Sequence, residues 1–146
     1  MILGTAEQDG TPWVSPVWFA ADAYREFLWI SSLDARHSRN IAARAQVSIV
    51  VFDSHVRAGV GQGVYMTATA HQLSELELKH GLAVFTRRER AHGIPESTLE
   101  DVSGRARLRL YRAVVAQHWI LDPTGRDGGP GRVRDLRVPV EPASPG

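Results

Sequence analysis

A chain of 146 residues with a formal net charge of +1 is long enough for one domain with a substantial core, and its charge gives no case for a nucleic-acid or polyanion binder. It contains no cysteine, which excludes a disulfide framework, thiolate chemistry and cysteine-ligated metals. It shows no signal peptide and no apolar run long enough to span a bilayer, so we expect a cytoplasmic protein without a membrane partner.

The N-terminal segment predicts a β-hairpin. Strand-like sequence at Ile2–Ala6 and Thr11–Ala20 flanks the turn signal Gln8-Asp9-Gly10. Pro16 cannot donate a ladder hydrogen bond, so it marks an edge or a bulge in the second arm. The tryptophans on either side of Pro16 could wall a flat ligand, although packing in the core is their commoner role.

The segment Phe27–Asn40 predicts a buried strand, a turn and the start of a helix. Residues 27–32 are rich in aromatic and branched side chains and end in two serines, as expected of a strand that runs into a polar turn. Asp34 is a plausible N-cap for a short helix over Ala35–Ala45.

This helix carries its cations at an unfavourable end. Arg36 and His37 fall in the first turn, where the helix dipole disfavours positive charge. An anion would resolve the conflict, because free backbone N–H groups, the Ser31 and Ser32 hydroxyls, Arg36 and Arg39 could converge on it. Arg36, Arg39 and Asn40 also share one helix face by their i, i+3, i+4 spacing. A solvated polar helix face explains the same spacing equally well.

The rest of the chain predicts mostly strands. We expect strands at Gln46–Phe52, Val64–His71, Arg105–Leu121 and Arg132–Val140, a helix from the capping box Ser74–Glu77 to about Arg90, and a helical turn at Pro95–Val102. Alternating arginines at 105, 107 and 109 suggest a solvated strand face far more than a nucleic-acid stripe. About seven strands and two main helices, joined by short turns, predict a mainly β (α+β) antiparallel barrel with helices packed outside.

Several strands are apolar on both faces, which predicts a partner. In the strand at Gln46–Phe52, Val47, Ile49 and Val51 alternate with Val50 and Phe52, and a barrel interior covers only one of these two faces. Two helices are too few to cover the other faces, so a two-fold homodimer is expected. The segment Gly61-Gln62-Gly63 could then lie near the Arg36 helix of the second chain.

The pattern as a whole resembles the pyridoxamine 5′-phosphate oxidase-like family, the flavin-binding split barrels. The resemblance rests on Gly10–Phe19, Trp29–Ser32, Arg36–Ile41, Val47–Asp53 and Gly63–Ala70. It implies an antiparallel split β-barrel over residues 1–140, a flexible tail over residues 141–146, and a homodimer that binds FMN in clefts at the subunit interface.

The resemblance also implies a set of cofactor contacts. Arg36 and His37 match the family's Arg-Lys pair on the FMN phosphate, with histidine in place of lysine, and the strand from Trp13 to Val17 matches the one along the flavin ring. The implied cofactor-binding residues are Trp13, Val14, Ser15, Pro16, Val17, Ile30, Ser31, Ser32, Arg36, His37, Ser38, Arg39, Gln62, Gly63, Trp119 and Arg132.

The expected function is an FMN-dependent oxidoreductase acting on a small, flat substrate. The segment Gly131–Asp135 lacks the histidine of the oxidase's substrate motif, so pyridoxine phosphate oxidation itself is not expected. Alternatives are an F420-dependent reductase, or a non-catalytic flavin-, haem- or tetrapyrrole-binding protein. No catalytic acid, base or nucleophile stands out, and the six histidines show no metal-ligand spacing.

Overall fold

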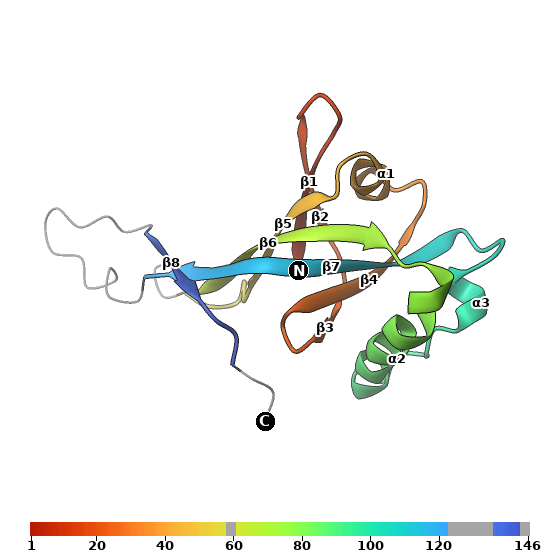
Figure 1. The fold of residues 1–146 in the computed structure, drawn as a ribbon. Helices are drawn as coiled ribbons and strands as arrows, with labels where there is room; N and C mark the ends of the chain where they lie inside the picture. Colours follow the sequence, from red (N-terminus) through yellow and green to blue (C-terminus); the bar gives the residue numbers. More distant parts are fainter. Residues whose placement is uncertain (58–60, 123–135, 144–146) are drawn as a thin grey trace, which may run out of the picture.

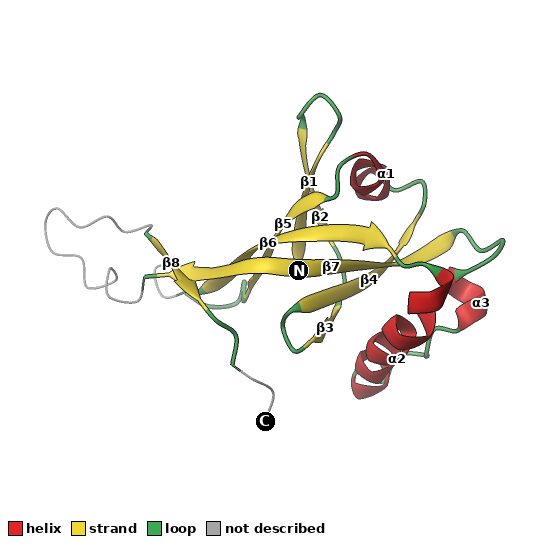
Figure 2. Ribbon diagram, viewed as in Figure 1, coloured by secondary structure: helices red, strands yellow, loops and turns green. Residues whose placement is uncertain are grey.

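The structure, a computed structural model, describes residues 1–57, 61–122 and 136–143 (Figure 1). These residues form one eight-stranded antiparallel sheet with helices packed against it (Figure 2). The strands are β1 (Ile2–Ala6), β2 (Pro12–Pro16), β3 (Ala20–Asp22), β4 (Glu26–Ser32), β5 (Gln46–Phe52), β6 (Gly63–Gln72), β7 (Leu108–Leu121) and β8 (Arg137–Val140). The helices are α1 (Arg36–Ala43), α2 (Glu75–Ala91) and α3 (Leu99–Val102).

The sheet is a split barrel, as predicted. Its strand order is β2-β1-β5-β6-β7-β4-β3, and within the described residues the two ends of this path do not pair, so the barrel is not closed. One edge of β7 serves two partners in succession: residues 108–114 pair with β4, and residues 118–121 pair with β8. The opposite edge of β7 pairs with β6, with a register shift between Thr67 and Ala68.

The predicted N-terminal hairpin is confirmed, but its second arm is shorter than expected. The register of β1 and β2 runs from Ile2 opposite Pro16 to Ala6 opposite Pro12, around a turn in which Gly10 has a φ of 93°. Beyond Pro16 the pairing continues for one more residue, because Val17 N–H donates to Met1 O at 2.9 Å and the Met1 amino group donates to Val17 O at 3.0 Å. Residues 18 and 19 then lead into β3, a strand that the sequence pattern did not separate from the second arm.

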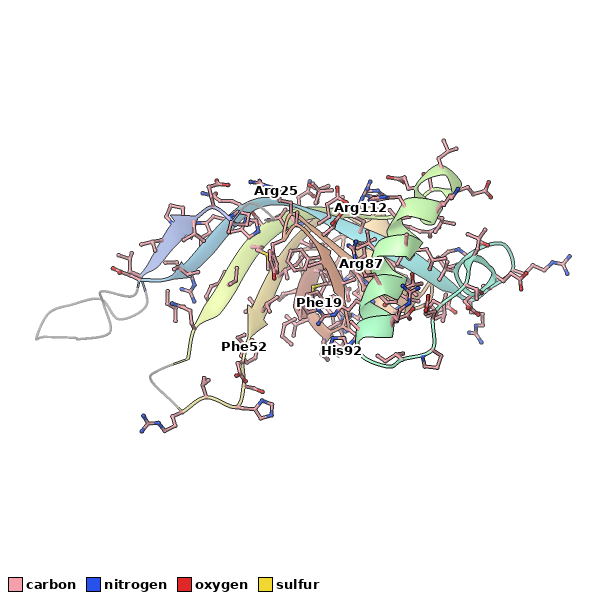
Figure 3. All side chains as sticks on the ribbon, turned by 90° about the horizontal axis from the view of Figure 1, so that it is seen from below. Phe19, Arg25, Phe52, Arg87, His92 and Arg112 are labelled. Carbon is pink, nitrogen blue, oxygen red and sulfur yellow. The ribbon has the colours of Figure 1, made fainter. Side chains whose placement is uncertain are left out.

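Apolar side chains form two clusters that share β4. The barrel interior contains Leu3, Phe27, Trp29, Ile41, Val47, Ile49, Met66, Ala68, Ala70, Tyr111 and Ala113. The second cluster, between the sheet and α2, contains Ala20, Leu28, Leu73, Leu78, Val84, Phe85, Val102 and Leu110. Figure 3 shows this layer from below, with α2 across the sheet and Phe19 near the end of α2 that carries His92.

The capping box that predicts α2 is present. Ser74 is the N-cap, its backbone N–H donates to Glu77 Oε2 at 2.9 Å, and its hydroxyl donates to the same oxygen at 2.6 Å. These bonds are the largest causes that lower the pKa of Glu77 to about 2, and Glu77 also accepts from Arg112.

In the described ranges, no helix is long and apolar enough to cross a membrane.

The C-terminal predictions need two corrections. The long strand begins at Leu108 rather than Arg105, and the three alternating arginines do not form a stripe. Arg107 pairs with Asp34 at 3.2 Å, while Arg109 turns back to the carbonyl oxygens of residues 104, 106 and 108. The last strand is observed at Arg137–Val140, and residues 132–135 of the predicted strand lie outside the described residues.

Candidate functional site

The start of α1 is an open helix N-terminus. The chain leaves β4 through a turn in which Ser32 Oγ accepts the Asp34 N–H at 3.1 Å, and Ser32 O accepts the Ala35 N–H at 3.1 Å. Ala35, not the predicted Asp34, is the N-cap, because this turn delays the helix by one residue and leaves the Asp34 carboxylate beside Arg107. No side chain caps this described helix, and its first turn contains no acid. Its first N–H groups and the positive end of its dipole therefore suit an anion.

Two serines and a histidine meet at this helix start. His37 Nδ1 is hydrogen-bonded to Ser15 Oγ of β2 at 3.1 Å, and His37 Nε2 to Ser31 Oγ of β4 at 2.8 Å. Trp13 Nε1 donates to Ser15 Oγ at 3.1 Å. Partial burial lowers the pKa of His37, so the neutral imidazole, with one donor and one acceptor nitrogen, links the two hydroxyls at neutral pH.

Arg36 lies beside this cluster but is already paired. Its guanidinium stacks over the Trp13 ring, 4.1 Å from the centroid, and it forms a salt bridge with Glu7 from the β1–β2 turn. Both side chains are partly exposed, at 38% for Arg36 and 35% for Glu7. Sequence reasoning missed Glu7, which supplies the negative charge that the helix start itself lacks.

The predicted common face of Arg36, Arg39 and Asn40 is wrong. Asn40 is buried and donates from Nδ2 to Thr5 Oγ1 at 3.0 Å, which fixes α1 to β1. Arg39 is exposed and turns back to the Asp34 carbonyl oxygen. Ser38, also in the first turn, is 3% exposed, and its hydroxyl has no hydrogen-bond partner among the described residues.

The remaining predicted contacts from β2 and β4 divide between two sides of the sheet. Ser15 is buried toward α1, whereas Val14 is 65% exposed on the neighbouring position of this edge strand. Ser31 reaches His37, but Ile30 points to the other side of β4 and packs against the α2 cluster. Pro16 and Val17 lie at the end of β2, beyond the Ser15–His37–Ser31 cluster.

The predicted distal contacts lie at the other end of the barrel. Ala70 of β6 lies close to α1, because its N–H donates to the carbonyl oxygen of Ala45, just after that helix. Gly63, at the start of β6, is seven residues from Ala70, which at about 3.3 Å per residue places it about 23 Å away. The Gln62 amide bonds the backbone N–H and carbonyl of Leu121, both at 3.0 Å. Trp119 faces Tyr65 and Pro139 in the strand register. Arg132 lies outside the described residues. One chain therefore does not bring Gln62, Gly63 or Trp119 to the α1 site.

No metal centre accompanies the site in the described part of the chain, where no group of three or more histidine, aspartate or glutamate side chains could hold a metal ion. The site contains instead an uncapped helix start, two hydroxyls, an imidazole and a guanidinium. These are groups that bind oxyanions.

The open antiparallel barrel, with a helix start turned toward two of its strands, defines the class of split-barrel proteins. Within that class the chain belongs to the pyridoxamine 5′-phosphate oxidase family, whose profile matches residues 1–119. No curated protein sequence matches the chain.

Solved structures with the same fold carry different cofactors in their names. A haem-binding protein from Mycobacterium smegmatis is 18% identical with a TM-score of 0.67; the alignment covers 95% of this chain but 51% of that one, so this chain spans about half its length. A FAD-binding protein from Mesorhizobium loti is 17% identical, with a TM-score of 0.60 and coverage of 82% and 83%. An F420 reductase is 18% identical, with a TM-score of 0.56 and coverage of 80% and 86%. At these identities the similarity establishes the fold, and the cofactor has to be argued from the site.

Proposed function

We propose that this protein is an FMN-dependent oxidoreductase that holds the cofactor phosphate at the start of α1. The observation that carries the proposal is the uncapped N-terminus of α1 beside the Ser15–His37–Ser31 cluster. Bound FMN would supply hydride and electron transfer, which the side chains of this chain do not provide themselves.

The residues present fit a phosphate. The first-turn N–H groups and the Ser31 hydroxyl can donate to phosphate oxygens, and the buried Ser38 hydroxyl has no partner among the described residues. Arg36 can pair with the phosphate after its salt bridge with Glu7 breaks. The Trp13 ring already supports the Arg36 guanidinium. His37 can contribute charge when protonated. Trp13 and Val14 lie on opposite faces of the edge strand β2 and are both exposed, at 39% and 65%, so each is accessible to the flavin ring.

A second copy of the chain would complete the site. Because Gln62, Gly63 and Trp119 lie far from α1 in one chain, they can contribute only from a partner. An apolar groove of about 410 Å³ supports such an assembly. It is lined by Met1, Ile2, Pro16, Val17, Trp18, Phe19, Val50, Val51 and Phe52. Apolar side chains exposed together at a barrel edge commonly mark a protein interface.

The visible spectrum of the purified protein tests the cofactor. Flavin gives two broad bands in the blue, whereas haem gives one sharp, intense band. FMN titrations of Arg36→Ala and Arg39→Ala test the phosphate site, with Arg90→Ala as the control because Arg90 is also paired with an acid, Glu96, but lies on α2. We expect weaker FMN binding in the first two variants only. Equal FMN affinity in all three, or a protein that binds haem or F420 and not FMN, contradicts the proposal.

Light scattering tests the dimer. We expect a dimer at micromolar concentration, and we expect Val50→Asp to lower both association and FMN occupancy, because Val50 lines the apolar groove. Val114→Asp is the matched control, since Val114 is 41% exposed on β7 and does not line that groove. A monomer that retains stoichiometric FMN would contradict the shared site and leave the phosphate site standing.

A further inference from the structure

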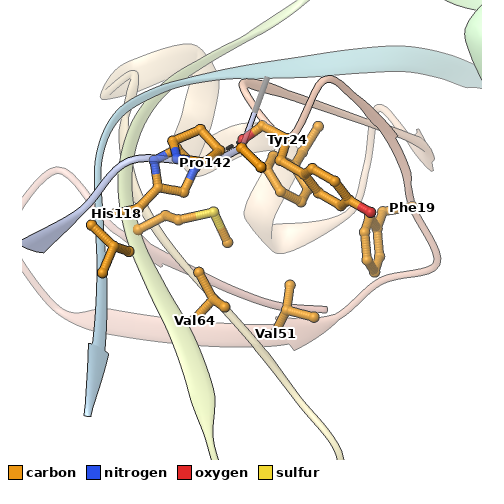
Figure 4. Close-up of a pocket in the computed structure, with 10 residues that line it drawn as sticks. Phe19, Tyr24, Val51, Val64, His118 and Pro142 are labelled. Atoms are coloured by element: carbon orange, nitrogen blue, oxygen red, sulfur yellow. Dashed lines mark hydrogen bonds between the residues drawn. The ribbon is translucent and has the colours of Figure 1, made fainter. Parts of the chain in front are cut away.

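A second cavity lies where the barrel splits. At this position β4 leaves the edge of β7 and β8 takes its place, and a pocket of about 280 Å³ opens into the barrel interior (Figure 4). Its walls include Phe19, Tyr24, Val51, Val64, His118 and Pro142. Its lining residues come from the segment 19–27, from β5, β6, β7 and β8, and from the residues just after β8, and none of them comes from α1.

His118 is a buried polar side chain in this largely apolar wall. It is 7% exposed, and its Nε2 lies 2.8 Å from the carbonyl oxygen of Tyr24. A carbonyl can only accept, so Nε2 is the donor of this bond and carries a proton. The bond joins β7 to the β3–β4 turn across the split and keeps the two sides of the pocket together.

The β3–β4 turn that forms one wall is strained. Ala23 and Tyr24 have φ values of 49° and 54°, and Arg25 N–H donates to Asp22 O at 3.0 Å. Two successive left-handed residues in a tight turn normally call for Asn-Gly, because each side chain costs about 1–2 kcal/mol in this conformation. A backbone carbonyl from any residue could accept from His118, so that hydrogen bond does not require tyrosine. Tyrosine at this strained position instead adds an aromatic ring to the pocket wall, and Tyr24 is 65% exposed.

We propose that this pocket binds a small, uncharged aromatic molecule of one or two fused rings, at a site separate from the phosphate site. An apolar protein cavity of about 150 Å³ accepts benzene, so a pocket about twice that size has room for a second ring. A charged ligand would find no countercharge among the lining residues, and a tetrapyrrole, with four rings around a macrocycle, exceeds the space. Phe27 of the pocket and Ser31 of the α1 site are four residues apart on β4, about 13 Å.

Indole is the probe for the test, with binding to the full chain followed by saturation-transfer NMR and calorimetry. Val64→Phe fills the pocket and should weaken indole binding at least tenfold. Val114→Phe adds the same side chain to an exposed position of β7 outside the pocket and should leave indole binding within twofold of the wild type. FMN affinity should be the same in Val64→Phe and the wild type, which separates this site from the proposed cofactor site.

Tyr24→Asn provides a second variant that keeps the fold. Asparagine tolerates the left-handed conformation, so the thermal midpoint should stay equal or rise, while indole affinity should fall at least threefold. The proposal is overturned if the wild type does not bind millimolar indole, if Val64→Phe binds it as tightly as the wild type, or if benzoate binds as tightly as indole. It is also overturned if a dimer structure seats a side chain of the second copy in the pocket.

Discussion

Replacing the two members of the Glu7–Arg36 salt bridge should change FMN affinity in opposite directions. In the proposed site Glu7 holds the guanidinium that the phosphate needs, so it competes with the ligand. Glu7→Gln removes the competitor and a repelling charge, and Arg36→Ala removes the phosphate contact. A salt bridge that served only the fold would give no such opposition, since both changes would then affect stability and neither would affect FMN.

The structure sets the size of both effects. The two side chains are 38% and 35% exposed, and a partly exposed ion pair is worth at most about 1 kcal/mol, so Glu7→Gln should tighten FMN binding by up to about fivefold. A hydrogen bond to a charged group is worth about 1.5–3 kcal/mol, so Arg36→Ala should weaken FMN binding by about 10- to 150-fold. We expect the gain in FMN affinity from Glu7→Gln to be smaller than the loss from Arg36→Ala. The Trp13 ring keeps Arg36 in place in the Glu7→Gln variant.

Quenching of flavin fluorescence on titration into protein measures both constants, at pH 7.5 in a buffer free of phosphate. Glu96→Gln is the matched control, because Glu96 also pairs with an arginine, Arg90, but does so at the far end of α2. It should leave FMN affinity unchanged. Weaker or unchanged FMN binding in Glu7→Gln would refute the competition, and unchanged binding in Arg36→Ala would refute the phosphate contact.

Three further predictions concern stability, each measured by urea denaturation. Burial lowers the pKa of His37, so the folded state takes up fewer protons than the unfolded state, and stability should fall as pH drops below about 6.5; His37→Gln should flatten this dependence, and an unchanged slope would exclude His37 as its source. Glu77→Ala should cost about 1 kcal/mol, because it removes the acceptor of the capping box with Ser74, and a cost near zero would contradict that role. Gly81→Ala should destabilise although alanine favours a helix by about 1 kcal/mol, because a Cβ there would lie 3.1 Å from Leu28 and closer still to Leu73; a more stable variant would show that these leucines repack freely.

Regular pattern was enough to predict most of the fold. The strands at Gln46–Phe52 and Gly63–Gln72 and the hairpin at the N-terminus follow from local alternation and from the turn at Gly10, which needs no knowledge of distant contacts. The capping box likewise marked the start of α2 within one turn of sequence. Family resemblance then supplied the split-barrel topology that these elements adopt.

The side-chain contacts of the site could not be predicted in the same way, because they join residues that are distant in sequence. Glu7 reaches Arg36 only because the β1–β2 turn rises beside α1, and 29 residues separate the two in the chain. Asp34 looked like a cap by position, but a turn centred on Ser32 and a pairing with Arg107, 73 residues away, decided its role. Helical spacing grouped Asn40 with the arginines, whereas burial against Thr5 removed it from them.

The same contacts predict that a phosphate could bind at the proposed α1 site without moving its frame. Asn40 and Ile41 fix α1 to the sheet through a buried hydrogen bond and the barrel core, and His37 is held between strands β2 and β4. Arg36 alone among these groups is paired with an acid that comes from a turn rather than from a strand or a helix. In the proposed site, a phosphate that takes the place of the Glu7 side chain at Arg36 would therefore find the helix dipole, the Ser31 hydroxyl and the aromatic support of Arg36 already in position.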